Sequence, residues 1–370
     1  MKTVRRLLYT DIVASVMFVA LAFLSLFFFI DFVDELDGVG TRGRTAGHAL
    51  LAAGLEVPGH LYELLPIAVL IGTIYSLARM AQSSEFTILR TGGLGPGRAL
   101  SLLAVLGVAF GALTFVTGDY VAPASEREAV LLKARFSGGI QLGGAGAWLK
   151  ERRSTSEGER SYSVNVAGAT AAGALAGIRI FEFDSDGRLV SRTEAREGHV
   201  GDDGTWLLSE VRQARWPAAR SRDDAAVRLE QHATLRWPST LSAAVVAAAV
   251  LPVSTMTTAE LWRYSVHLSD QEQATQQHQI RFWRKALYPL ACLVMVALAL
   301  PFAYLHARAG STSLKVFGGI MLGISFVLLN NLSGHIGMLR GWTPWVAAAT
   351  PSLLYLALSM AAFAWLVRYR

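Results

Sequence analysis

Long runs without a charged side chain alternate with polar segments along this chain of 370 residues. An α-helix rises about 1.5 Å per residue, so roughly 20 apolar residues are needed to cross the hydrocarbon core of a membrane. Residues 12–30 form such a run between Asp11 and Asp31. Comparable runs follow, and together they predict six membrane-spanning helices, at residues 12–30, 64–78, 99–118, 286–305, 316–339 and 341–367.

One uncharged stretch, at residues 237–259, does not fit the pattern of a span. Its apolar part, residues 241–251, consists mostly of alanine and is followed by Pro252. So short and weakly apolar a run cannot cross about 30 Å of hydrocarbon. We therefore expect no seventh span here.

Basic residues gather in the segments that six spans place on one side of the membrane. With the N-terminus in the cytoplasm, the short cytoplasmic segments contain ten basic residues against two acidic ones, Asp11 and Glu85. The two short outer loops contain three basic and six acidic residues. An excess of Lys and Arg on the cytoplasmic side is the rule for membrane proteins. Both ends of the chain are therefore predicted to be cytoplasmic.

The polar segment at residues 119–285 lies outside the membrane in this topology, and its middle has the patterns of β-strands. Short strands are predicted by alternating apolar and polar positions between turn residues, at 161–166, 178–183, 189–193, 206–211 and 227–237. Repeated short strands of this kind favour an antiparallel sandwich or jelly roll. The flanking residues 124–136 and 257–279 have helical patterns.

These patterns predict an α-helical integral membrane protein with six transmembrane helices (3+3) and an inserted periplasmic all-β jelly-roll-like domain. The first three spans occupy residues 1–118, with a short cytoplasmic helix at about 82–91. The predicted remainder is a periplasmic helical connector at 119–139, the β domain at 140–238, a second connector at 239–282 and the last three spans at 283–370.

The composition agrees with a membrane protein and excludes other classes. Hydrophobic residues make up 52% of the chain and charged residues 17%, against about 25% charged in soluble domains, which excludes intrinsic disorder. The single cysteine, Cys292, excludes an internal disulfide and a cysteine-based zinc site. No pattern predicts a catalytic centre or a metal site. The net charge of +6 follows the topology and does not mark a nucleic-acid-binding surface.

The cytoplasmic segment at residues 79–98 holds the clearest candidate for a functional contact. The chain has no Gly-Lys pair and hence no Walker A loop, so ATP-driven work needs another subunit. The first part of the segment can form two helical turns, on which Phe86, Leu89 and Arg90 cluster beside Glu85. Such a helix can dock into a nucleotide-binding subunit, or it can rest on lipid headgroups as an ordinary amphipathic loop.

Four segments carry a resemblance to a known family: DFVDEL (31–36), SSEFTILRTGG (83–93), DYVAP (119–123) and FWRKALYPLACLVMVALALPFAY (282–304). They resemble the LptF/LptG (YjgP/YjgQ) family, the permeases of the lipopolysaccharide export ABC transporter. The resemblance covers nearly the whole chain. DFVDEL and WRKALYP are more similar to the LptG branch of the family than to the paralogous LptF branch.

The resemblance implies a transport subunit and not an enzyme. The implied partners are LptF in a heterodimer, a cytoplasmic dimer of the ATPase LptB, LptC and, indirectly, LptA. LptB would bind ATP and Mg²⁺, so this chain would need no cofactor of its own. Lipopolysaccharide would be extracted from the outer leaflet of the inner (cytoplasmic) membrane of a Gram-negative bacterium and passed through LptC to the LptA bridge.

The resemblance also implies functional positions. Glu85 would be the acid of a coupling helix seated in a groove of LptB, and the first and fifth spans would form lateral gates. The candidates for the substrate cavity or gate are Phe27, Asp31, Asp34, Arg42, Arg44, Lys133, Arg135, Asn330 and His335. Similar proteins often carry basic residues just outside the first span. This chain has an acidic run at 31–37 there, which could instead bind a divalent cation carried with the lipid.

The polar residues Asn330, Asn331 and His335 lie at membrane depth in the fifth predicted span. Polar side chains at this depth either line a cavity or form hydrogen bonds between helices. The sequence does not choose between these two roles.

Three other functions stay open at this point. The chain could be the paralogous LptF subunit of the same transporter. It could be an ABC permease of the mechanotransmission type, although such proteins usually have four spans with the external domain after the first. It could also be a membrane enzyme that modifies lipids, which would need a polar catalytic cluster at the membrane surface.

Overall fold

The computed structural model describes residues 2–93, 95–137, 140–141, 146–155, 158–170, 174–201, 205–217, 227–241, 243–250, 252–270, 276–304 and 312–368. The chain folds into two compact units. The first unit comprises Met1–Asp37, Ala53–Ser125 and Gln276–Arg370. The second unit comprises Gly38–Ala52 and Glu126–Thr275.

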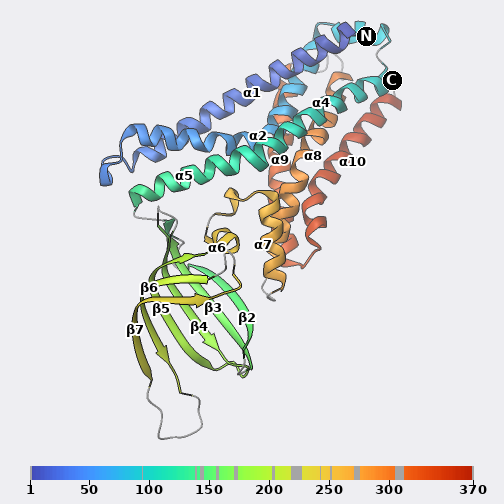
Figure 1. Cartoon of the computed structure of the whole chain (residues 1–370). Helices are drawn as coiled ribbons and strands as arrows, with labels where there is room; N and C mark the ends of the chain where they lie inside the picture. Colours follow the sequence, from blue (N-terminus) through green and yellow to red (C-terminus); the bar gives the residue numbers. More distant parts are fainter. Residues whose placement is uncertain are drawn as a thin grey trace. The chain divides into compact units, whose positions relative to one another are not determined.

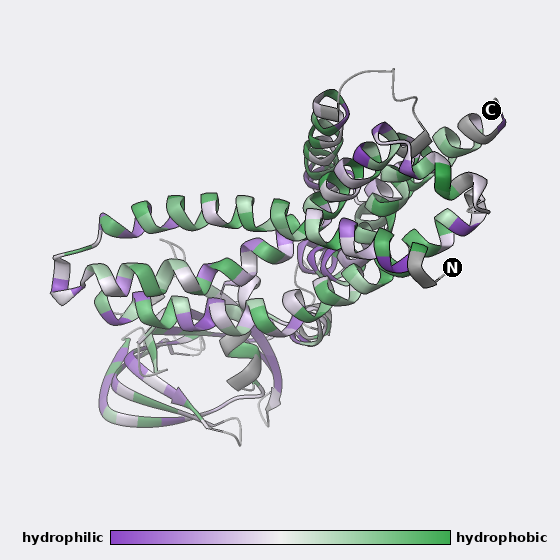
Figure 2. Ribbon diagram, turned by 90° about the horizontal axis from the view of Figure 1, so that it is seen from above, coloured by the Kyte–Doolittle hydropathy of each residue, from purple (hydrophilic) through white to green (hydrophobic). Residues whose placement is uncertain are grey.

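Long apolar helices make up the first unit (Figure 1). They are α1 (Lys2–Leu36), α2 (Ala46–Gln82, from Ala53 onward), the short α3 (Glu85–Thr91), α4 (Pro96–Val116), α8 (Gln276–Tyr304), α9 (Thr312–Leu339) and α10 (Pro344–Arg368). Six helical segments in the described part of the chain are long and apolar enough to cross a membrane. Figure 2 shows how strongly hydrophobic residues dominate them. The six predicted spans and their 3+3 order are confirmed.

Several helices extend well beyond the uncharged runs from which the spans were predicted. α1 continues to Leu36 and α2 already begins at Ala46, so most of the predicted first outer loop is helical. α4 passes through a π-helical turn at Thr117–Val121 into α5 (Ala122–Ser137). The uncharged runs underestimate the helices because a helix tolerates charged residues where its end leaves the hydrocarbon or where the charge is paired.

Glycines allow the spanning helices to pack closely. A Cβ atom on Gly72 of α2 would lie 2.6 Å from the backbone of Val16 on α1. One on Gly111 of α4 would lie 2.9 Å from the carbonyl oxygen of Pro289 on α8. Only glycine fits at such contacts, and small residues at helix interfaces are the usual means of association in membranes, where lipid tails compete with apolar side chains.

The helices differ greatly in how much of their surface the chain itself covers. In the most apolar part of each span, 78% of α2 is buried, against 22% of α1 and 22% of α9. α2 is therefore the central helix of the first unit. α1 and α9 expose long apolar faces that must meet lipid or another subunit, because water does not tolerate such surfaces.

A single curved antiparallel sheet forms the centre of the second unit (Figure 1). Its strands are β1 (Ile140–Gln141), β2 (Ala147–Thr155), β3 (Gly158–Ala169), β4 (Leu175–Phe183), β5 (Leu189–Val200), β6 (Thr205–Arg215) and β7 (Arg228–Pro238). From β2 to β7, strands adjacent in the sequence pair with each other, while β1 pairs with β3 beside β2. The expected all-β domain is confirmed. The hydrophobic pattern does not predict β2, because four consecutive charged residues interrupt it: Lys150, Glu151, Arg152 and Arg153.

The apolar face of the sheet packs around Trp206, which is fully buried. The uncharged stretch that we rejected as a span begins at Trp237 in β7 and continues into helix α6 (Ala243–Val250). Val246 and Val250 of α6 belong to the same hydrophobic core as Trp206. The helix is therefore a cover for the β core, and the rejection of a seventh span is confirmed.

A buried carboxylate ties β2 to the chain that leaves β7. Glu151 is fully buried and accepts hydrogen bonds from the Ser239 hydroxyl at 2.7 Å and from the Thr240 backbone N–H at 2.7 Å. The Arg153 guanidinium lies 3.2 Å from the same carboxylate and stacks over the ring of Tyr162. The charge is thus paired and hydrogen-bonded, which is the condition for burying it at tolerable cost.

Helix α7 (Thr258–Asp270) begins with a capping box. The Glu260 N–H donates to the Thr257 hydroxyl, and the Thr257 N–H donates to the Glu260 carboxylate at 2.8 Å. Arg127 of α5 also binds this carboxylate and donates to the Thr255 carbonyl. Partial burial alone would raise the pKa of Glu260, but the hydrogen bonds from Arg127 and Thr257 outweigh it and lower the pKa.

We predict that Glu151→Ala destabilises the second unit by about 3–5 kcal/mol, because it leaves the half-buried Arg153 without its carboxylate partner and removes the acceptor for Ser239 and Thr240. The control is Glu194→Ala, which removes an exposed carboxylate paired with Arg192 and should cost at most about 1 kcal/mol. Urea unfolding of the full chain in detergent, followed by circular dichroism, measures both. Equal effects of the two substitutions would contradict the structural role given to Glu151.

Candidate functional site

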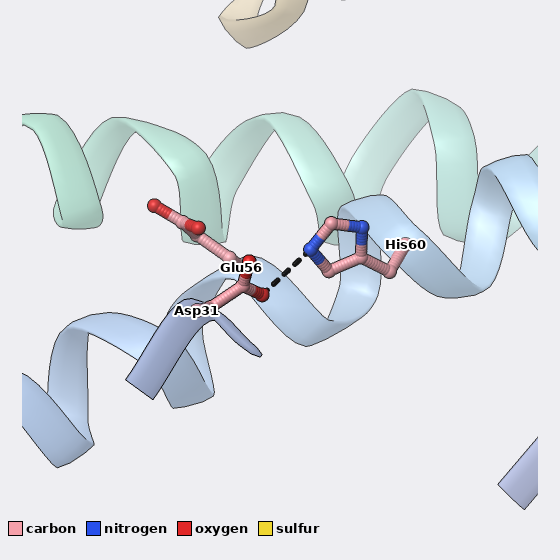
Figure 3. Close-up of side chains that lie close together, drawn as sticks. All are labelled: Asp31, Glu56 and His60. Carbon is pink, nitrogen blue, oxygen red and sulfur yellow. Dashed lines mark hydrogen bonds and ion pairs between the residues drawn. The ribbon is translucent and has the colours of Figure 1, made fainter. Parts of the chain in front are cut away.

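The C-terminal part of α1 meets α2 through three side chains that can bind cations (Figure 3). Asp31 lies on α1, and Glu56 and His60 lie one turn apart on α2. The imidazole Nε2 of His60 donates to the Asp31 carboxylate at 2.7 Å. One donor atom from each of the three residues lies within 4.8 Å of the others. The ring of Phe27, one turn before Asp31, stacks on His60 with 5.0 Å between centroids.

A second polar contact joins the same two helices near the start of α1. The Ser76 hydroxyl of α2, which is fully buried, donates to the Asp11 carboxylate at 2.7 Å. Arg79, one turn further along α2, forms an ion pair with the same carboxylate. Between the two contacts, the α1 residues Ile12, Val16 and Ala20 are buried in the core of the first unit. α1 is thus held by polar contacts at two levels and by apolar packing between them.

The predicted coupling segment is the helix α3. Phe86 is 3% exposed and belongs to the hydrophobic core of the first unit, and Leu89 packs against the same core. Glu85 is exposed, as is Ile88, whose exposed fraction is 66%. The helix therefore anchors itself through Phe86 and Leu89, and it presents Glu85 and Ile88 on its surface. The side chain of Arg90 lies outside the part of the chain that the structure describes.

The polar residues of α9 lie near the start of α8. The Arg284 guanidinium donates to the Asn331 side-chain carbonyl at 2.8 Å, which is a hydrogen bond between the two helices. His335 is exposed, and its ring Nδ1 donates to the backbone carbonyl of Asn331 at 2.9 Å. Asn330 is half-buried. For Asn331, the structure therefore decides in favour of an interhelical hydrogen bond, the second of the two roles left open by the sequence.

The basic candidates belong to the second unit, whereas Phe27, Asp31 and the exposed Asp34 belong to the first. Arg42 donates to the backbone carbonyl of Phe136 at 3.3 Å, near the end of α5. Arg44 and Lys133 are half-buried, and Arg135 is exposed. The contact of Arg42 gives that residue a structural role, because it binds one of the unpaired carbonyl groups at a helix end.

Two features of these regions do not follow from the sequence pattern alone. Phe86 and Leu89 were predicted to be the apolar contact residues of the coupling helix, but they face the core of the first unit. Ile88, in the same segment, is the apolar residue on the exposed face. Glu56 and His60 were assigned to a loop. Their spacing of four residues, which places both on one face of a helix, was the available signal.

A sequence model of the family described as "Lipopolysaccharide export system permease LptF/LptG" matches residues 6–368 of this chain. The chain belongs to the LptF/LptG family. This is a family of permeases and not of enzymes, and its members belong to the lipopolysaccharide export system. The six helices and the inserted antiparallel sheet fit this membership.

Two relatives within the LptF/LptG family illustrate the similarity. The lipopolysaccharide export system permease protein LptG of Haemophilus influenzae (strain Rd) is 25% identical over 362 residues, which cover 96% of each chain. LptG of Escherichia coli K12 is 25% identical over 352 residues, which cover 94% of each chain. The similarity thus extends over both compact units, including the inserted β domain.

We predict that Asp11→Ala destabilises the first unit by about 1–3 kcal/mol, because the buried Ser76 hydroxyl loses its acceptor and Arg79 loses its partner. Asp34→Ala is the matched control on the same helix, since Asp34 is exposed, and it should leave stability within about 0.5 kcal/mol. Equilibrium unfolding in mixed micelles compares them. Indistinguishable stabilities would show that the contact at Asp11 does not hold α1.

Proposed function

We propose that this chain is the LptG-type subunit of a lipopolysaccharide export permease. In this role it pairs with an LptF subunit, is driven by an LptB ATPase dimer, and hands lipopolysaccharide through LptC to LptA. The observation that carries the proposal is the similarity to LptG proteins over nearly the full length of both chains. The DFVDEL and WRKALYP segments support the LptG branch over the LptF branch.

The proposed orientation places both chain ends and α3 in the cytoplasm and the β domain in the periplasm, with the spans in the inner membrane of a Gram-negative bacterium. The excess of basic residues in the short segments on the α3 side supports it. An even number of spans also requires both chain ends to lie on one side. In this orientation the contact at Asp11 is near the cytoplasm and the contact at Asp31 is near the periplasm.

The coupling role proposed for α3 rests on its two faces, one of which packs on the core while the other is exposed. Phe86 and Leu89 pack onto the core that also contains α2 and α4 residues such as Met80 and Ala99. A force applied to the outward face of α3, at Glu85 and Ile88, is therefore transmitted directly to two spanning helices. This is the arrangement that a permease needs if an ATPase without contact to the membrane is to move it.

The outward faces of α1 and α9 are the proposed surfaces for the lipid and for LptF. On α1, the exposed residues include Phe18, Leu21 and Phe29. On α9, they include Leu328 and Leu332. Apolar faces that this chain leaves uncovered on both helices fit a transporter whose cavity is completed by a second subunit. It does not fit a monomeric lipid-modifying enzyme, which would need a complete site of its own.

We predict that Glu85→Lys and Ile88→Asp each reduce recovery of the ATPase with the purified permease at least about tenfold, which corresponds to roughly 1.4 kcal/mol of lost contact energy. A reversed charge and a buried aspartate are both unfavourable in a docked groove. Glu63→Lys is the matched control, because Glu63 is an exposed carboxylate near the middle of α2, far along the helix from α3. Normal recovery of ATPase and normal lipopolysaccharide transport in both variants would refute the coupling role.

A further inference from the structure

Asp31, Glu56 and His60 bring together three donor groups that the proposed transport function does not use. Glu56 and His60 are one turn apart on α2, and Asp31 reaches them from α1 (Figure 3). All three residues are half-buried, and their donor atoms lie within 4.8 Å of one another. This group differs from the acidic run at 31–37 of α1. Only Asp31 belongs to that run, and the other two residues come from α2.

We propose that Asp31, Glu56 and His60 form a binding site for a divalent transition-metal cation such as Zn²⁺. One imidazole nitrogen and two carboxylate oxygens are ligands that Zn²⁺ and its neighbours accept. Mg²⁺ and Ca²⁺ prefer oxygen ligands alone, so the histidine selects against them. Three protein ligands leave at least one coordination position of Zn²⁺ for water or for an anionic oxygen.

The present contacts already resemble those of a ligated cation. The proton between His60 Nε2 and the Asp31 carboxylate, which are 2.7 Å apart, occupies the place where a cation would bind both. Metal–ligand bonds of about 2.0–2.2 Å place donor atoms roughly 3–3.6 Å apart. Donors within 4.8 Å of one another therefore need side-chain shifts of only about 1 Å. Phe27 fixes the plane of the imidazole by stacking on it, which is how surrounding residues orient metal ligands.

The electrostatic setting also favours a cation. The site holds two carboxylates and one imidazole, and Asp31 stands in α1 among the exposed apolar residues Phe29, Ile30 and Val33. Carboxylates beside apolar surface at the edge of a membrane are costly unless they are paired. A bound divalent cation would neutralise the pair of charges and would join α1 to α2 at the outer end of the span.

The test uses the full chain, purified in detergent and stripped with EDTA, with Zn²⁺ alone as the probe. Isothermal titration is expected to find one site per chain that excess Mg²⁺ does not occupy. His60→Ala and Glu56→Gln should each weaken this site at least about 10–100-fold, the loss found when even the supporting residues of metal ligands are removed. Glu63→Gln on α2 and His335→Ala on α9 are the matched controls, and both should bind as the wild type does.

Two further measurements keep the result unambiguous. Zn²⁺ should raise the unfolding temperature of the wild type and of Glu63→Gln, but not that of His60→Ala, because a ligand stabilises only a fold that binds it. Asp31→Glu retains the carboxylate and should retain binding, which distinguishes the loss of a ligand in the other variants from misfolding. Equal Zn²⁺ binding by the wild type and by the Asp31→Asn, Glu56→Gln, His60→Ala triple variant would mean adventitious surface binding only and would overturn the proposal. Because the readout is metal binding alone, its failure would not bear on lipopolysaccharide transport.

Discussion

The pairing of α1 with α2 combines close backbone approach with polar bonds, and the low polarity of a membrane dictates this form. Apolar side chains gain little by leaving lipid, so close backbone contact and polar bonds must hold the helices together. Gly72 allows the backbone of Val16 to approach. The contacts at Asp11 and Asp31 lie twenty residues apart on α1, or about 30 Å along a helix, which is the thickness of the hydrocarbon core.

This arrangement leaves a permease subunit with one central helix and two exposed ones. α2 is covered on most sides, whereas α1 and α9 present apolar faces to lipid or to a partner. α3 connects to the same core through Phe86 and Leu89, which is the contact on which the coupling role that we propose for this helix rests.

The sequence predicted the six spans and five of the strands because these depend on hydrophobic pattern, which local sequence carries. It did not predict that most of residues 31–63 are helical, since Glu56 interrupts the apolar run that marks a span. For the same reason it missed β2, where Glu151 is buried among partners that lie far along the chain. The grouping of Asp31 with His60, and the burial of Phe86, depend on packing between helices and leave no trace in a single stretch of sequence.

The most direct measurement is photocrosslinking in cells that produce lipopolysaccharide, with a photoreactive residue replacing Phe29 on α1 or Leu328 on α9. Leu353 on α10, which is exposed to a similar extent at 59% against 63% and 64%, is the control position. The account predicts adducts with lipopolysaccharide or with the partner permease at Phe29 and Leu328, and neither adduct at Leu353. Adducts of equal yield at all three positions, or none at the first two, would contradict it.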